Sequence, residues 1–255
     1  MTAREAAALL VVVALLGYVG VVMPRRAERL LAALRQRIAA DPAERFRFYL
    51  RYLRMAAVGV AVYAATAWLG GHGAAVAGAG WSDRALMRLF PGLLLSGVVL
   101  DAGLLALFVV GRRRDPEAMK KENQYARVEF LVPSAPRERR MWPLVCLAIA
   151  VVEECVYRGL FVLYAARLLD LSPWWLVVPT SLVFGVAHAY QGWLGIAATT
   201  VMGAAFAVVT VVTGSLLPAV VLHLLFDLRL AYVKRPGPAA PGPGGDSALP
   251  PEPLG

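Results

Sequence analysis

One uncharged stretch restricts this chain more than any other feature of its sequence. Between Asp170 and Asp227, 56 consecutive residues include no Asp, Glu, Lys or Arg. A helix that crosses the hydrocarbon core of a membrane needs about 20 mostly apolar residues, so this stretch has room for more than one such helix. Hydrophobic residues also make up 59% of the 255 residues. We therefore expect an all-α fold, a polytopic membrane helix bundle.

We predict about seven transmembrane helices from the apolar segments. These segments lie at roughly residues 5–23, 55–71, 89–110, 142–168, 174–190, 193–213 and 216–233. The first resembles a secretory signal peptide in its apolar run from Ala6 to Val22. However, Arg25 and Arg26 follow the run where a cleavable signal has small residues, so we interpret it as a retained anchor.

The basic residues predict how the chain is oriented. Nine arginines fall between residues 24 and 54, and nine lysines or arginines fall between residues 111 and 140. The positive-inside rule places both segments in the cytoplasm, which puts the N-terminus outside and the C-terminus in the cytoplasm. These segments suit anionic lipid headgroups, so the net charge of +9 requires no nucleic-acid partner. The Ala-, Leu- and Arg-rich composition indicates a bacterial inner membrane protein.

Three regions are expected along the chain. Residues 1–110 would form N-terminal transmembrane helices with a basic cytoplasmic loop, and residues 111–235 would form the core that carries the polar motifs described below. Residues 236–255 are rich in Pro and Gly and are predicted to be a disordered tail. Within the basic loop, residues 28–39 have the spacing of a helix that lies on the inner membrane surface, although a plain cytosolic linker remains an alternative.

Five Glu, His and Asp residues lie inside the predicted spans of the second half of the chain. Glu153 and Glu154 are adjacent in the fourth predicted span, and a carboxylate at bilayer depth costs on the order of 3 kcal/mol. At 1.5 Å per residue, Glu153 lies about 18 Å along the helix from its cytoplasmic end, which is close to the midplane. His188, His223 and Asp227 lie in the fifth and seventh predicted spans. We expect these groups to converge on one polar site, although polar contacts that only hold helices together are the alternative.

Helical spacing sorts these residues into pairs. Glu154 and Arg158 stand four positions apart, so they share a helix face and are predicted to form an ion pair with Arg158 as a structural partner. Glu153 points about 100° away from Glu154 and is left available for another partner. His223 and Asp227 are also four positions apart.

Three motifs carry a family resemblance. They are Glu153-Glu154-Cys-Val-Tyr-Arg158, Phe184-Gly-Val-Ala-His188 and His223-Leu-Leu-Phe-Asp227. In type, order and placement they resemble the motifs of the CPBP family of intramembrane proteases, also called Abi, which includes the CAAX prenyl endopeptidases of eukaryotes. The resemblance covers about residues 130–233, and the first 110 residues resemble no family that we can name.

The resemblance implies an intramembrane endopeptidase whose catalytic residues are Glu153, Glu154, His188, His223 and Asp227. Glu153 and His188 would activate a water. His223 and Asp227 would stabilise the oxyanion or help to bind a metal. The implied partner is a membrane-anchored protein or peptide substrate in the lipid bilayer, and the sequence does not address the oligomeric state.

The cofactor stays open between zinc and none. His188, His223 and Glu153 would suffice as ligands of a catalytic Zn²⁺, while a buried glutamate beside a second carboxyl can serve as a general base without metal. Asp227 departs from the family pattern, because the prenyl endopeptidases have Asn there. Asn can donate a hydrogen bond to an oxyanion and an ionised Asp cannot, which favours a metal ligand or a residue that orients His223.

Two other functions remain as alternatives. A non-catalytic immunity or binding protein would use the same fold without turnover. A transporter would also place Glu, His and Asp at the midplane, but such folds usually contain inverted repeats and broken helices, and neither is evident.

Overall fold

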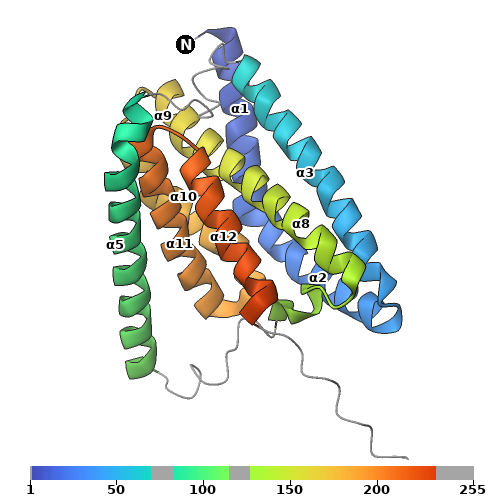
Figure 1. The fold of residues 1–255 in the computed structure, drawn as a ribbon. Helices are drawn as coiled ribbons and strands as arrows, with labels where there is room; N and C mark the ends of the chain where they lie inside the picture. The colour runs from blue at the N-terminus through green and yellow to red at the C-terminus, as the bar shows by residue number, and fades with distance from the viewer. Residues whose placement is uncertain (1, 70–82, 115–126, 234–255) are drawn as a thin grey trace, which may run out of the picture.

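A computed structural model describes residues 2–69, 83–114 and 127–233 of the chain (Figure 1). This part is 92% helical and contains no β-strand, so the predicted all-α fold is confirmed. The predicted tail, residues 236–255, lies outside the described residues.

The described residues contain seven helices when consecutive elements that run on without a break are counted together, which agrees with the predicted number. The individual elements that make up these helices and the short turns between them are α1 Ala3–Gly17, η1 Tyr18–Val22, α2 Met23–Ala40, α3 Ala43–Leu69, α5 Asp83–Arg114, η2 Glu129–Leu131, α8 Pro136–Glu154, η3 Cys155–Tyr164, α9 Ala165–Leu168, α10 Trp174–Ala187, η4 Ala189–Gln191, α11 Gly192–Thr213 and α12 Leu217–Val233. The segments η1 and η3 are π-helical, whereas η2 and η4 are single 3₁₀ turns.

Several of these helices have the length and composition of membrane spans. Four are long and apolar enough to cross a bilayer: Ala3–Ala40, Ala43–Leu69, Met87–Gly111 and Ala189–Thr213. Two shorter helices, Trp174–Ala187 and Leu217–Leu228, are also apolar. The protein is therefore an integral membrane protein.

The first two predicted spans differ most from the helices of the structure. The first span continues without a break to Ala40, and the second begins at Ala43 rather than near residue 55. Most of the arginine-rich segment predicted as a loop is therefore helical, because Arg favours helix almost as much as Leu does. The π-helical turn η1 ends just before Pro24, where the missing N–H would otherwise disturb the hydrogen-bond ladder.

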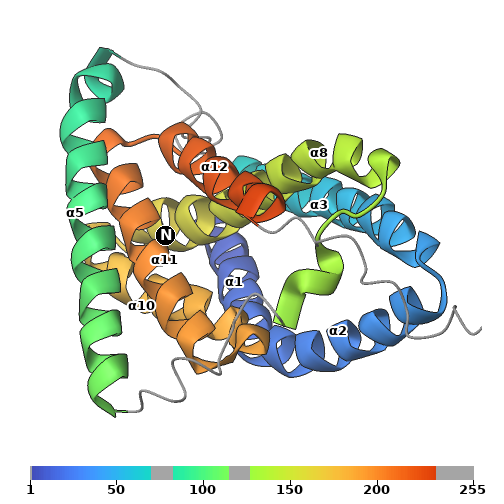
Figure 2. The ribbon, with the colours of Figure 1, turned by 60° about the horizontal axis from the view of Figure 1, so that its bottom comes forward.

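Helix α2 leaves the direction of α1 after this turn, as Figure 2 shows. It packs on α3 and on η4, burying Leu34 and Ile38 while Leu30 stays 63% exposed. In Figure 1, α2, the start of α8 and the end of α12 lie at the same end of the bundle. The arginines of α2 and of the first turn of α8 therefore lie at one end of the bundle.

Small residues bring the central helices close together. Helix α11 packs against both α5 and α10. A Cβ on Gly185 of α10 would collide with the Thr200 side chain of α11, and one on Gly103 of α5 would collide with Val201. These glycines therefore allow α11 to pack closely against α5 and α10.

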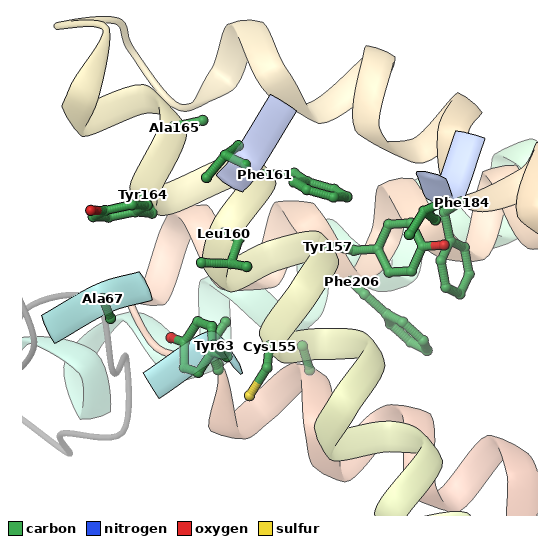
Figure 3. Close-up of a cluster of buried hydrophobic side chains, with 14 of the residues drawn as sticks. Tyr63, Ala67, Cys155, Tyr157, Leu160, Phe161, Tyr164, Ala165, Phe184 and Phe206 are labelled. Atoms are coloured by element: carbon green, nitrogen blue, oxygen red, sulfur yellow. The ribbon is translucent and has the colours of Figure 1, made fainter. Parts of the chain in front are cut away.

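The core surrounds the π-helical segment η3. Tyr157, Leu160 and Phe161 of η3 are buried against Phe184 of α10 and Phe206 of α11 (Figure 3). Tyr157 meets both Phe161 and Phe184 edge-on, the arrangement that aromatic rings prefer. This packing fixes η3 in the middle of the bundle, and with it the end of α8.

An ion pair fastens the beginning of α8 to α3. Arg45 donates from Nε to the Phe130 carbonyl at 2.8 Å and from Nη1 to Glu138 Oε2 at 3.0 Å. Glu138 Oε2 also accepts from the backbone N–H groups of Ser134 and Ala135. Burial alone would raise the pKa of Glu138, but the two N–H groups and the Arg45 guanidinium hold that pKa below its usual value.

Candidate active site

Three separate elements bring the predicted site residues together. Glu153 and Glu154 are the last two residues of α8, His188 directly follows α10, and His223 and Asp227 lie on α12. The Nε2 atoms of His188 and His223 stand 4.0 and 3.8 Å from Glu153 Oε2. The five residues that the sequence singled out therefore form one cluster, with Glu153 at its centre.

His188 occupies the end of its helix rather than its interior. Helix α10 stops at Ala187, three residues earlier than predicted, and the His188 backbone leaves the helical conformation. Its Nδ1 lies 2.8 Å from the carbonyl oxygen of Phe184, which can only accept, so Nδ1 carries the hydrogen. In the neutral ring the lone pair is then on Nε2, the atom that faces Glu153.

His223 is held by the second glutamate of the pair. Its Nδ1 lies 2.8 Å from Glu154 Oε1, a hydrogen bond between residues 69 positions apart. The Nε2 atom faces two other carboxylates, at 3.8 Å from Glu153 Oε2 and 3.7 Å from Asp227 Oδ2. A carboxylate on Nδ1 fixes both the orientation of the ring and the position of its hydrogen.

Glu154 is in turn held by the predicted partner. Arg158 Nη1 donates to Glu154 Oε1 at 2.9 Å, and Nη2 donates to the Gly203 carbonyl at 2.9 Å. The guanidinium also lies 4.6 Å from the centre of the Phe184 ring, within the range of a cation–π contact. Arg158 and Glu154 are both fully buried, and a buried charge of this kind is tolerated only when it is paired.

Glu153 has a buried oxygen without a hydrogen-bond partner among the described residues, as Glu154 has at its own Oε2, but only the Glu153 oxygen is faced by two imidazole rings. Its side chain is 20% exposed, yet Oε2 itself is buried and has no hydrogen bond to any of the described residues. Buried carboxylate oxygens normally accept at least one hydrogen bond, so Glu153 Oε2 is available to accept one from a further polar group. It is also the atom that both imidazole rings face.

Sequence reasoning missed three tyrosines and one change of helix type. Tyr52 of α3, Tyr157 of η3 and Tyr190 of η4 all interact electrostatically with Glu153. Tyr190 stands two residues after His188, so its place beside that motif was a usable signal. No pattern marked Tyr52, or the π-helical segment that begins directly after Glu154.

The predicted zinc ligands do not form a ligand set in this arrangement. The imidazole and carboxylate donors are the types that zinc takes. Among the residues with described positions, however, no group of three His, Cys, Asp or Glu is placed to hold a metal ion.

A comparison with protein families identifies the segment that carries this cluster. Residues 136–229 match the family model described as "Type II CAAX prenyl endopeptidase Rce1-like". Comparisons with curated proteins and with solved structures gave no match. The matched segment contains all three motifs, whereas α1, α2, α3 and α5 lie before it. The resemblance inferred from the motifs is thus confirmed by the family comparison, because residues 136–229, which carry all three motifs, match the model of the Rce1-like type II CAAX prenyl endopeptidases.

Proposed function

We propose that this protein is an intramembrane endopeptidase that hydrolyses membrane-anchored proteins or peptides with water activated by Glu153 and His188. The observation that carries the proposal is the unpaired Oε2 of Glu153, which two imidazole rings face. The family match supports protease activity in general. The residue roles are those that the motif resemblance implies, and the distances within the cluster support them.

The separation of Glu153 and His188 suits one shared water. Their facing atoms stand 4.0 Å apart, which is too far for a direct hydrogen bond. A water about 2.8 Å from each atom bridges such a distance, donating one hydrogen to Glu153 Oε2 and the other to His188 Nε2. His188 can accept because its own hydrogen is held on Nδ1 by the Phe184 carbonyl.

The reaction then proceeds in two steps. Glu153 takes a proton from the water as the water oxygen bonds to the carbonyl carbon of the substrate, and the carbonyl oxygen becomes an oxyanion. As the oxyanion collapses, the bond between carbon and nitrogen breaks, and the proton passes from Glu153 to the departing nitrogen. The products are an amine and a carboxylic acid, and Glu153 is a carboxylate again.

The other members of the cluster position these two residues. Arg158 orients Glu154, and Glu154 orients His223. The His223 Nε2 atom in turn lies beside Glu153 and Asp227. Residues at this distance from the reacting atoms act by fixing geometry, which contributes strongly to rate when the reacting groups must be aligned.

The substrate and the setting complete the proposal. We place the protein in the bacterial inner membrane, with the basic segments and the C-terminus in the cytoplasm and the N-terminus outside. Because C-terminal prenylation is not expected in such a cell, the proposed substrate is a membrane-anchored peptide or sorting signal rather than a prenylated protein. Residues 111–235 form the proposed protease core, and residues 1–110 flank it.

The test compares protein termini in source cells that carry the wild type, Glu153→Gln or Glu28→Gln at equal abundance. Glu28 is an exposed glutamate on α2, so its variant is a matched control for loss of a carboxylate. Mass spectrometry of membrane-protein termini should find new termini with the wild type and the control, and none with Glu153→Gln. Identical termini in all three strains would reject proteolysis and favour the non-catalytic immunity or binding function.

A further inference from the structure

The cluster around Glu153 is rich in acceptors and poor in donors. The Nδ1 hydrogens of His188 and His223 are already bonded to the Phe184 carbonyl and to Glu154. A hydrogen on His223 Nε2 would face two carboxylates, Glu153 and Asp227. An ionised Asp227 cannot donate at all. Stabilising an oxyanion formed here therefore requires a hydrogen-bond donor that is not already bonded to a carboxylate.

Tyr190 is placed to be that donor. It lies in η4, the turn that directly follows His188, and the centres of the two rings are 5.7 Å apart. Its phenol is within electrostatic range of Glu153 and Asp227, the two acids that border the proposed reaction centre. Tyr190 is also inside the family-matched segment, unlike Tyr52 of α3.

The neighbouring residues orient the Tyr190 hydroxyl. Gln191 Nε2 lies 3.3 Å from the phenolic oxygen and donates to it. Accepting that bond occupies a lone pair and leaves the phenolic hydrogen for another acceptor. Gln191 itself packs against Gly195, where any Cβ would collide with the Gln191 side chain. Gly192 closes the turn at φ 84°, a conformation that favours glycine.

Tyr157, the other tyrosine of the matched segment that interacts electrostatically with Glu153, is less suited. Its ring packs edge-on against Phe161 and Phe184 in the core, and the residue is only 4% exposed. It therefore serves the packing of η3. Tyr190 instead borders His188, the residue proposed to hold the attacking water.

We propose that Tyr190 donates a hydrogen bond from its phenol to the oxyanion of the tetrahedral intermediate. This role rests on the proposed function. The phenolic hydrogen stays on its oxygen throughout the reaction. The bond strengthens as charge builds on the carbonyl oxygen and weakens again when the carbonyl re-forms and the bond between carbon and nitrogen breaks. Tyr190 thus supplies the donor that Asp227, in its ionised form, cannot.

The test uses the full-length protein in liposomes and a synthetic peptide that spans a cleavage site found by the comparison of termini. Four proteins are compared: the wild type, Glu153→Gln, Tyr190→Phe and Tyr63→Phe. The last is the control, because Tyr63 packs against Gly159 in the core cluster and takes no part in the proposed chemistry. Thermal unfolding of each protein reports whether the substitution disturbs the fold.

Tyr190→Phe should lower kcat by about 100-fold, the usual cost of losing one oxyanion donor, and leave KM and the melting temperature unchanged. Tyr63→Phe should retain kcat. A Tyr190→Phe protein with the wild-type kcat, or one with both a lower melting temperature and a raised KM, would overturn this inference while proteolysis stands. No cleavage by the wild type, or equal cleavage by Glu153→Gln, would instead overturn the proposed function, and this inference with it.

Discussion

His223 and Arg158 share one oxygen atom of Glu154. The Nδ1 of His223 and the Nη1 of Arg158 lie 2.8 and 2.9 Å from the same Oε1. This single oxygen joins α12 to the junction of α8 and η3, and Arg158 extends the connection to α11 through the Gly203 carbonyl. A substitution of Arg158 should therefore affect His223, because both side chains bond to the same oxygen of Glu154.

Arg158→Met is expected to destabilise the protein by about 3–5 kcal/mol, because it leaves the Glu154 carboxylate buried without its cation. Thermal unfolding in detergent would measure the loss. Arg47→Met is the matched control, since Arg47 forms exposed ion pairs at the end of the bundle and should cost less than about 1 kcal/mol. Equal melting temperatures for the two variants would contradict the importance of the buried pair.

Gly203→Ala should destabilise by about 1–3 kcal/mol through overpacking. The new Cβ would stand 3.0 Å from Phe184 Cδ1 and 3.4 Å from an Arg158 nitrogen, so both side chains would have to move. Gly97→Ala tests the same exchange in open space, because nothing lies within 4 Å of a Cβ at that position of α5. It should be neutral or slightly stabilising, since Ala favours helix more than Gly does. A Gly203→Ala protein that unfolds at the same temperature as Gly97→Ala would show that the site tolerates the methyl group.

Acid should weaken the contact between α3 and α8 through Glu138. The pKa of this group in the folded protein lies below its usual value of 4.5, so its contribution to stability is full above that value. The contribution is lost as the pH falls from about 4.5 through the lower folded pKa. Melting temperatures of the wild type and Glu138→Gln should therefore converge as the pH falls through this range. A constant difference between them down to strongly acidic pH would refute the assignment.

Asp227→Asn should reduce the dependence of cleavage on Tyr190. The amide of Asn can donate a hydrogen bond, so the variant gains a second donor near the oxyanion. In a double-mutant cycle, Tyr190→Phe should then cost less in kcat on the Asp227→Asn background than on the wild type. Equal costs on the two backgrounds would mean that residues 190 and 227 do not serve the same oxygen.

Chelation should leave cleavage unchanged, because the described side chains do not gather as metal ligands and the proposed steps need no metal. Peptide cleavage before and after dialysis against a strong chelator, with metal content measured in parallel, provides the check. Loss of activity that zinc restores would instead require His188, His223 and Glu153 to close around an ion, as the alternative based on sequence allowed.

The sequence predicted local relationships better than long-range ones. The pair of Glu154 and Arg158 follows from spacing on one helix, and the structure contains it at 2.9 Å. The bond from His223 to Glu154 depends on how α12 packs against α8, which no local pattern encodes. For the same reason the sequence did not predict the electrostatic interaction of Tyr52 with Glu153, because the two residues are about 100 positions apart in the chain.

Helix ends were the other weakness of sequence reasoning. Apolar residues continue beyond Ala187, so hydropathy extended the fifth span through His188, whereas the backbone turns there and closes at Gly192. Hydropathy also cannot distinguish an α-helical from a π-helical stretch of equally apolar residues. Hydropathy therefore predicts an ordinary α-helix for η3, whereas the structure has a π-helix there. Such π-helical insertions often occur at functional sites.

The contact between Arg45 and Glu138 limits how the proposed protease core could be exchanged among proteins. The segment of the family match begins at residue 136, so it contains Glu138 but not the guanidinium that neutralises it. The helix that presents Glu153 is therefore anchored by a residue from outside the shared segment. In a chimera with different N-terminal helices, the Glu138 carboxylate in the first turn of α8 would no longer contact Arg45. The start of α8 therefore depends for its electrostatic balance on α3, a helix that precedes the matched segment.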